Sequence, residues 1–215
     1  MLHIEYLIPI FALWHTITTD VRKYKHDHGV ANNMVSAIHC VTYIAQYTNI
    51  PDRNYTIHVS IGYYIYDLLY LLYALYAKKT TQVKQYTIYV LHHFIMLYIL
   101  LITLTDQDRE PLLHTFFLAE LSNITLYLSY HLHKEYPQHG NIIRATEFIQ
   151  LLWYSYFRMY RSSLLLYNDD LHLSNYSIVY QCSAYLLYLM GIFCSVSLVK
   201  KNIANCRVVN PYRAA

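Results

Sequence analysis

Eight strongly polar side chains stand inside long apolar stretches of the sequence, and these are the residues that could do chemistry. They are His39, Asp67, His92, His93, Glu120, Asn123, Glu147 and Arg158. Ionisable groups are costly within hydrocarbon, so they usually face the interior of a helix bundle and often mark a functional path. Ser36 lies three residues before His39 and joins the set as a smaller polar residue on the same helical face.

The adjacent histidines His92 and His93 offer acid–base or nucleophilic chemistry. A neutral imidazole can accept a proton from a hydroxyl or amine nucleophile, or can itself be acylated. Asp67 or Glu120 could supply a carboxylate that favours the imidazolium form. Neighbouring residues on a helix point about 100° apart, so at most one of the two rings can face the centre of a cavity. We predict His92 and His93 as the candidate catalytic residues, one facing the cavity and the other contacting an adjacent helix.

Several other kinds of site are not predicted. Adjacent histidines are a poor pair for one metal ion, because chelation from a helix favours a spacing of three or four, and no H-E-x-x-H motif occurs. The cysteines, at 40, 182, 194 and 206, are too few and too far apart for a disulfide scaffold or a zinc ribbon. The net charge of +3 comes from short scattered clusters, which does not suggest nucleic-acid binding. We expect no metal and no bound cofactor.

The elements that must position these side chains are membrane helices. Hydrophobic residues make up 56% of the 215 and charged residues only 13%, against roughly 25% in a typical soluble domain. A spanning helix needs about 20 mostly apolar residues. Seven stretches qualify if tyrosine counts as a semi-apolar residue, at about 2–18, 31–49, 57–77, 86–105, 112–131, 142–163 and 174–199. The sequence predicts an all-α membrane bundle of seven transmembrane helices around an internal polar cavity.

Lysine and arginine alternate between the connecting segments. The first, third and fifth loops and the tail are basic, with Arg22, Lys23 and Lys25, then Lys78, Lys79 and Lys84, then Lys134, then Lys200, Lys201, Arg207 and Arg213. Arg144 opens the helix that follows the fifth loop. The other loops are neutral or acidic, with Asp52 and Arg53, then Asp106, Asp108, Arg109 and Glu110, then Asp169 and Asp170. The positive-inside rule therefore predicts seven spans with a lumenal N-terminus and a cytosolic C-terminus.

Two arrangements of the polar residues remain open. They either line one internal cavity or make separate helix–helix contacts, since small polar residues also hold membrane helices together. The 26 tyrosines make any tyrosine-containing stripe easy to find by chance. The predicted cavity-lining residues are Ser36, His39, Asp67, Glu120, Asn123, Glu147 and Arg158. A guanidinium in a membrane needs partners, so we expect Arg158 to be paired with a carboxylate or tyrosine hydroxyls, with snorkelling to the interface as the alternative.

Five short motifs occur in a fixed order. They are N-N-M-V-S-A-I-H from Asn32, S-I-G-Y-Y-I-Y-D-L-L from Ser60, Y-V-L-H-H-F from Tyr89, A-E-L-S-N from Ala119 and Y-F-R-M-Y from Tyr156. In order and spacing, over about residues 30–200, they resemble the TLC domain, a family named for the translocating-chain-associated protein, the longevity-assurance ceramide synthases and the ceroid-lipofuscinosis membrane protein. The small TLC-domain-containing transmembrane proteins are the most similar branch in character.

The resemblance implies a multi-pass protein of the endoplasmic reticulum or a related endomembrane that handles lipids. In the ceramide synthases a histidine pair and downstream aspartates line a tunnel where an acyl chain passes from coenzyme A to a sphingoid amine. His92 and His93 match that pair, so acyl-coenzyme A becomes a possible co-substrate. The chain departs where the synthases carry H-D-x-x-D, since Glu120 and Asn123 replace the paired aspartates. The homeobox-like insert is also absent, because the first cytosolic loop is expected to be only about a dozen residues.

Two classes of function follow from these expectations. One is a lipid-handling membrane protein that transfers an acyl group to a lipid acceptor with its histidine pair. The other is a non-enzymatic lipid sensor, regulator of membrane composition or cargo receptor with the same fold. A transporter or channel is disfavoured because neither repeat halves nor broken-helix pairs are visible. We expect a first helix and loop over 1–29, a TLC-like domain over 30–200, a cytosolic tail over 201–215, and membrane lipids as partners; the oligomeric state is not predicted.

Overall fold

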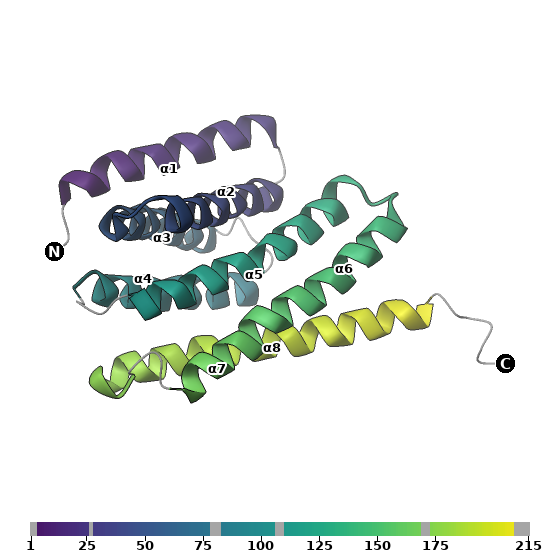
Figure 1. The fold of residues 1–215 in the computed structure, drawn as a ribbon. Helices are drawn as coiled ribbons and strands as arrows, with labels where there is room; N and C mark the ends of the chain where they lie inside the picture. Colours follow the sequence, from purple (N-terminus) through teal and green to yellow (C-terminus); the bar gives the residue numbers. More distant parts are fainter. Residues whose placement is uncertain (1–3, 26–27, 78–82, 106–109, 169–172, 209–215) are drawn as a thin grey trace.

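The computed structural model describes residues 4–25, 28–77, 83–105, 110–168 and 173–208, and all regular secondary structure in these ranges is helical (Figure 1). The long helices are α1 (Ile4–Tyr24), α2 (His28–Asn49), α3 (Arg53–Tyr76), α4 (Val83–Thr105), α5 (Glu110–Glu135), α6 (Gly140–Ser155) and α8 (Ile178–Val208). A π-helical segment, η1 (Tyr156–Arg161), and α7 (Ser162–Tyr167) continue α6, and the 3₁₀ turn η2 (Leu173–Asn175) precedes α8. The all-α prediction is confirmed for these residues.

Helix boundaries follow local signals in the sequence. The Asp52 side chain accepts a hydrogen bond from the Asn54 backbone N–H at 3.0 Å and so caps the start of α3. Pro111 lies in the first turn of α5, where a missing N–H costs nothing. Arg22 and Lys23 occupy the last turn of α1, where cations are favourable.

The helices extend further into polar sequence than their apolar stretches indicate. Helix α1 continues to Tyr24 and α2 begins at His28, so the predicted first loop is far shorter than a dozen residues. Helix α8 runs to Val208, so part of the predicted tail from residue 201 is helical. Helical backbone hydrogen bonds do not require apolar side chains, and hydropathy therefore marks only the middle of each helix.

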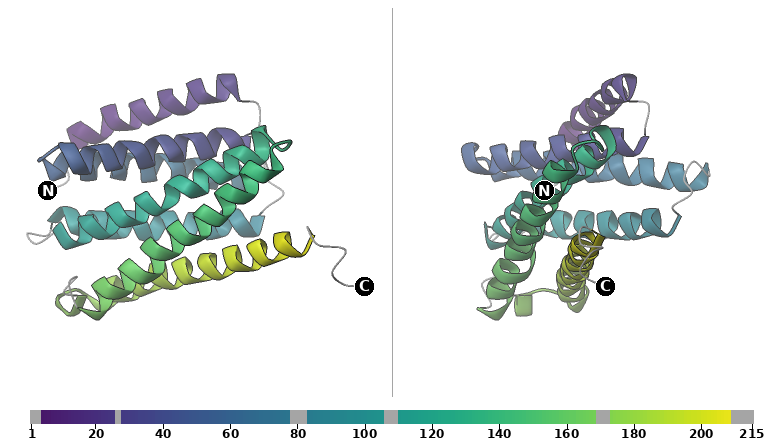
Figure 2. Two further views of the ribbon diagram at one scale, coloured as in Figure 1. Left: turned by 45° about the vertical axis from the view of Figure 1, so that its right-hand side comes forward. Right: turned by 90° about the vertical axis from the view of Figure 1, so that its right-hand side faces the viewer.

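Helix α1 lies on one side of the molecule and α8 on the other (Figure 1). The helices are not all aligned, because the right-hand view of Figure 2 shows α8 nearly along its axis and α3 and α4 lengthwise. Helix α2 packs on α5, α3 on α4, α1 on α3, α5 on α6, and α6 on α8. The approach of α1 to α3 is close, because a Cβ atom at Gly62 would lie only 2.3 Å from Cγ2 of Ile10. Small residues at such positions let membrane helices come together.

Aromatic and aliphatic residues together form the core between α1 and α5. Trp14, Tyr43 and Tyr63 are almost fully buried together with Ile57, Ile61 and Leu100. The Trp14 indole N–H donates to the Val59 carbonyl at 3.2 Å, which satisfies its one polar atom and ties α1 to α3. A second, smaller apolar cluster joins α4, the start of α5 and α8 around Ile99 and Tyr180.

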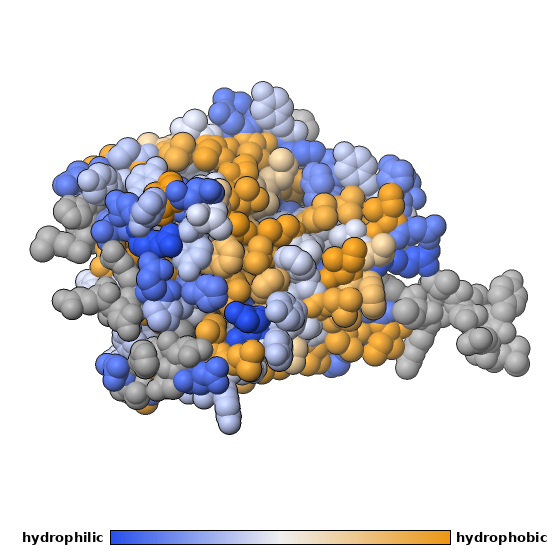
Figure 3. Space-filling view, in the orientation of Figure 1, coloured by the Kyte–Doolittle hydropathy of each residue, from blue (hydrophilic) through white to orange (hydrophobic). Residues whose placement is uncertain are grey.

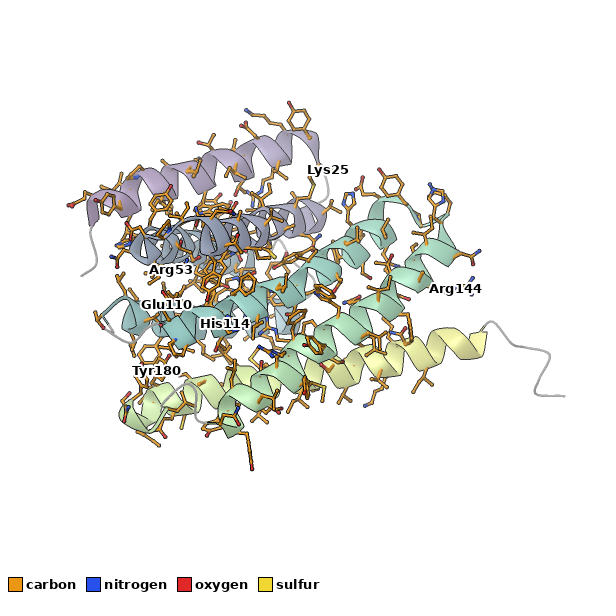
Figure 4. The ribbon with its side chains drawn as sticks, viewed as in Figure 1. Lys25, Arg53, Glu110, His114, Arg144 and Tyr180 are labelled. Atoms are coloured by element: carbon orange, nitrogen blue, oxygen red, sulfur yellow. The ribbon has the colours of Figure 1, made fainter. Side chains whose placement is uncertain are left out.

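The two ends of the bundle differ in charge. Lys25 and Arg144 lie toward one end and Arg53 and Glu110 toward the other (Figure 4). We call the first the basic end, because in the described residues it carries Arg22, Lys23, Lys25, Lys134, Arg144, Lys200 and Lys201. An ion pair joins Lys25, the residue after α1, to Glu135 at the end of α5, and Arg53 Nε contacts Glu110 Oε1 at 3.0 Å at the opposite end.

Part of the predicted charge pattern lies outside the described residues or on side chains that the structure does not describe. These residues are Lys78, Lys79, Lys84, Asp106, Asp108, Arg109, Asp169, Asp170, Arg207 and Arg213.

Apolar side chains cover much of the middle of the face seen in Figure 3, and hydrophilic ones gather toward the two ends. Two helical stretches in the described residues, Tyr86–Thr105 and Ile178–Ile203, are long and apolar enough to cross a membrane by length and composition. The other long helices carry more tyrosine, histidine and amide side chains. Seven membrane spans therefore remain a prediction.

Candidate functional site

Asp67 and His93 form a close pair between α3 and α4. The Nε2 atom of His93 lies 2.9 Å from Oδ2 of Asp67, and only 3% of the Asp67 side chain is exposed. The other ring nitrogen, Nδ1, lies 2.7 Å from the Tyr89 carbonyl and must donate its hydrogen there. A carboxylate and a bare ring nitrogen would repel at 2.9 Å, so one proton must lie between Nε2 and Oδ2. The pair therefore shares one proton, either as imidazolium and carboxylate or as imidazole and carboxylic acid.

His92 points elsewhere, as its position next to His93 requires. The two rings meet edge to face, with centroids 5.5 Å apart and planes at 88°. His92 makes no hydrogen bond to a residue that the structure describes. The two predicted catalytic candidates are therefore distinct in environment, since His93 has both ring nitrogens engaged and His92 has neither.

Glu120 is the second buried carboxyl group of this region, and only 3% of its side chain is exposed. The Tyr64 hydroxyl donates to its Oε1 atom at 3.1 Å, and the Asn123 amide lies 3.5 Å from Oε2. His39 approaches the same carboxyl group, with Nδ1 at 3.9 Å from Oε1. The Glu120 carboxyl group is thus surrounded by a phenol, an amide and an imidazole.

His39 belongs to the wall of the same region. Its ring stacks on Tyr63 with centroids 3.9 Å apart, and its Nε2 atom lies 3.2 Å from the Ser60 hydroxyl. The Tyr63 hydroxyl donates to Ser36 at 2.9 Å. Ser36 and His39 therefore face α3, where Ser60 and Tyr63 are their partners.

Tyr64 connects the two buried carboxyl groups. Its ring packs against His93 with centroids 5.2 Å apart, while its hydroxyl bonds Glu120. We name the resulting set the polar cluster, and its members are Ser36, His39, Ser60, Tyr63, Tyr64, Asp67, His93, Glu120 and Asn123. It draws side chains from α2, α3, α4 and α5 into the interior of the bundle.

Arg158 borders the polar cluster from the η1 segment. Its Nε atom donates to the Ser122 hydroxyl at 2.9 Å, and Nη2 donates to the Asn123 side-chain oxygen at 3.3 Å. The guanidinium also lies 5.7 Å from the Tyr154 ring centroid. The side chain therefore points into the bundle and does not snorkel. Its hydrogen-bond partners are a serine hydroxyl and an amide, so the expectation of a carboxylate or tyrosine hydroxyl was wrong. The Asn123 side chain lies between the guanidinium and the Glu120 carboxyl group and bonds both of them.

Glu147 does not join the polar cluster. Its Oε1 atom lies 2.6 Å from His133 Nε2 and 2.7 Å from Lys201 Nζ, in a contact that ties α5, α6 and α8 together toward the basic end. Eleven residues separate it from Arg158 along the helical segment, which is a distance of about 16 Å. The prediction that Glu147 shares a lining with the other residues finds no support in this geometry.

A cavity of about 90 Å³ lies next to Arg158, between α4, α5, η1, α7 and α8. A separate groove of about 300 Å³ lies between α2 and α5, lined by Met34, Ala37, Cys40, Val41 and Tyr127 among others. The lining of the first cavity includes Met96, which lies one turn beyond His92 on α4, but neither His92 nor His93 lines it. A lipid chain would find apolar walls there and polar groups at one end.

Sequence reasoning overlooked Tyr64 and Ser122. Tyr64 lies four residues after Ser60 and three before Asp67, so helical spacing places it on their face of α3. The abundance of tyrosine concealed this signal. Ser122 sits inside the A-E-L-S-N motif, but serine is common in membrane helices and only the position of Arg158 reveals its role.

The comparisons with known proteins agree with the ordered motifs. The sequence model of the TLC domain matches residues 10–204, a range that begins within α1 and ends within α8. No curated protein and no solved structure matches the chain significantly. Since the matched range covers most of the 215 residues, the protein belongs to the TLC domain family.

Proposed function

We propose that the protein is a lipid-handling integral membrane protein that transfers an acyl group to a lipid acceptor at the Asp67–His93 pair. The observation that carries this proposal is the 2.9 Å contact between His93 Nε2 and Asp67 Oδ2, enclosed by apolar helices. Membership of the TLC domain family supports the lipid-related part.

The reaction we propose uses the proton held by this pair. An acceptor hydroxyl or amine attacks the carbonyl carbon of acyl-coenzyme A, so a carbon–oxygen or carbon–nitrogen bond forms and the carbon–sulfur bond breaks. The pair gives its proton to the departing thiolate and takes up the proton of the acceptor. It ends the reaction as it began, so neither an oxidant nor a further reactant is needed.

The placement in the membrane is part of the same proposal. Every long helix exposes large apolar residues, among them Ile8, Val41, Leu69, Phe94, Leu128, Phe148 and Phe193. Apolar surface on all sides of a bundle with charged ends fits a hydrocarbon environment. We propose seven spans in the endoplasmic reticulum or a related endomembrane, with the basic end in the cytosol.

Lipid mass spectrometry of cells that express the wild type, His93→Gln or His114→Gln tests the proposal. His114 is a matched control, because it lies on α5 beside Tyr47 and outside the polar cluster. An acylated lipid that accumulates with the wild type and His114→Gln but not with His93→Gln supports acyl transfer. Equal accumulation with all three proteins would remove His93 from the reaction.

A second function is favoured by one specific observation. Both ring nitrogens of His93 are already engaged, by Asp67 and by the Tyr89 carbonyl, which suits a binding role as well as turnover. The protein would then sense or carry lipids without transforming them. In that case the lipid profile changes on expression, while labelled acyl-coenzyme A added to the membranes yields no labelled lipid.

A further inference from the structure

The cavity beside Arg158 combines apolar walls with one cation. Its walls include Met96, Ile99, Leu112, Phe116, Leu173 and Leu187. Arg158 is the only charged residue among those that line it in the described part of the chain. A cation that faces an apolar cavity within a membrane is costly unless an anion or strong acceptor meets it.

The guanidinium has donors to spare. An arginine carries five N–H groups, and the Ser122 and Asn123 bonds occupy two of them. Arg158 forms no ion pair with a described carboxylate. A planar guanidinium with free donors on one edge matches a carboxylate, which it binds with two parallel hydrogen bonds.

Two backbone features surround the Arg158 side chain, a π-helical segment and a glycine of α8. Arg158 lies in the π-helical segment Tyr156–Arg161, and π-helical turns within α-helices occur frequently at functional sites. Gly191 of α8 faces the stem of the side chain, and a Cβ atom there would lie 3.4 Å from Arg158 Cβ and 3.7 Å from Cδ. The lack of a side chain at Gly191 therefore leaves room for α8 to pack on the arginine stem.

We infer that this cavity binds a long-chain carboxylate, with the carboxylate on Arg158 and the hydrocarbon chain along the apolar walls. The cavity of about 90 Å³ holds several water-sized groups, which is enough for part of one chain and too little for a whole phospholipid. A neutral amphiphile would leave the spare guanidinium donors without an anion in direct contact, since Glu120 reaches Arg158 only through space and through Asn123. A phosphodiester lipid would carry its headgroup into apolar surroundings, which is costly.

The chain would run away from the basic end. Arg158 contacts α5 at Ser122, whereas Leu112, ten residues earlier on α5, and Tyr180, near the start of α8, lie at the far end of the cavity. Ten residues of helix span about 15 Å. Binding in this mode uses neither His93 nor coenzyme A, so the inference goes beyond the proposed acyl transfer and does not depend on it.

Equilibrium binding of radiolabelled oleate to the purified full-length protein in lipid nanodiscs tests the inference, with oleyl alcohol and oleylamine as competitors. The variants are Arg158→Gln, Arg158→Lys and Ala184→Phe, and the last fills the cavity from α8 while leaving the arginine in place. Arg161→Gln is the matched control, because it removes a charge from the same η1 segment but does not line the cavity.

We expect saturable binding of oleate to the wild type and to Arg161→Gln. The affinity for oleate should fall at least about tenfold in Arg158→Gln and in Ala184→Phe, and by an intermediate factor in Arg158→Lys. Competition by oleyl alcohol as strong as by unlabelled oleate would overturn the inference, and this comparison needs no variant to fold. Unchanged oleate affinity in folded Arg158→Gln would also overturn it.

A His93→Gln preparation is assayed alongside the others, for oleate binding and for acyl transfer. Oleate binding that persists in this variant while acyl transfer is absent from all preparations would overturn only the proposed function.

Discussion

His93 Nε2 and Asp67 Oδ2 face each other across 2.9 Å while the opposite ring nitrogen of His93 is held by the Tyr89 carbonyl. This arrangement fixes the tautomer of the imidazole and confines one proton to the space between α3 and α4. A histidine held on one side by a backbone carbonyl and on the other by a carboxylate has a fixed orientation without any ligand. The remaining members of the polar cluster pack around the pair through Tyr64.

Asp67→Asn should lower the rate of acyl transfer more than His92→Gln does. Asparagine can still accept or donate a hydrogen bond to His93, but it cannot hold the shared proton, and loss of a positioned acid–base group costs about 10²–10⁴-fold in rate. His92 makes no hydrogen bond to a described residue, so its replacement leaves the pair intact. Initial rates with labelled acyl-coenzyme A on matched amounts of folded protein provide the measurement. A larger loss in His92→Gln than in Asp67→Asn would assign the chemistry to His92.

Gly62→Val should destabilise the packing of α1 on α3. The added side chain would overlap Ile10 Cγ2, which already lies 2.3 Å from the position of a Cβ atom, and overpacking of this kind costs about 1–3 kcal/mol. Thermal unfolding of the detergent-solubilised protein should show a lower Tm than the wild type. Gly140→Ala is the control, because nothing lies within 4 Å of a Cβ atom at that position. An unchanged Tm for Gly62→Val would contradict the close approach of α1 to α3.

Glu147→Gln should reduce thermal stability without changing oleate binding or acyl transfer per folded molecule. The substitution leaves Lys201 and His133 without their buried carboxylate partner, and those two side chains are 47% and 40% exposed, so water compensates part of the loss. Glu135→Gln, which removes the partner of Lys25, serves as a comparison at the same end of the bundle. Loss of acyl transfer in Glu147→Gln at unchanged thermal stability would show that Glu147 contributes to the candidate site.

An epitope tag after Ala215 should be accessible to antibody when only the plasma membrane is permeabilised. The alternation of the helices places the end of α8 at the basic end, with Lys25 and Arg144 (Figures 1 and 4). The positive-inside rule assigns that end to the cytosol. A tag placed before Ile4 should remain protected until the internal membranes are opened as well. The reverse pattern of accessibility would invert the proposed orientation.

Much of the fold could be predicted from the sequence because apolar stretches of about 20 residues mark helices directly. The π-helical segment at Tyr156–Arg161 could not, because no turn residue interrupts Y-F-R-M-Y-R. Its position decides the partners of Arg158, so those partners were predicted wrongly. The positions of the helices can be predicted from local sequence. The change from α-helical to π-helical hydrogen bonding at Tyr156–Arg161 cannot.

The candidate site likewise has a part that the sequence predicts and a part that it does not. Asp67, His93 and Glu120 each lie well inside a predicted apolar stretch, which indicates that they sit in the interior of the bundle, and the structure places the three in one cluster. Glu147 has similar chemistry, but α6 turns it toward Lys201 of α8, more than 50 residues away in sequence. Which face of one helix meets another depends on packing across the whole bundle, and a single sequence does not display it.

The most direct test of the central claim is a single-turnover assay on the purified wild-type protein and Asp67→Asn in lipid nanodiscs. The assay supplies radiolabelled long-chain acyl-coenzyme A and a mixed lipid acceptor pool, and it measures labelled lipid together with released coenzyme A. Our account predicts stoichiometric appearance of both products with the wild type and a rate about 10²–10⁴-fold lower with Asp67→Asn. Equal rates for the two proteins, or no labelled lipid from the folded wild type, would contradict acyl transfer at the Asp67–His93 pair.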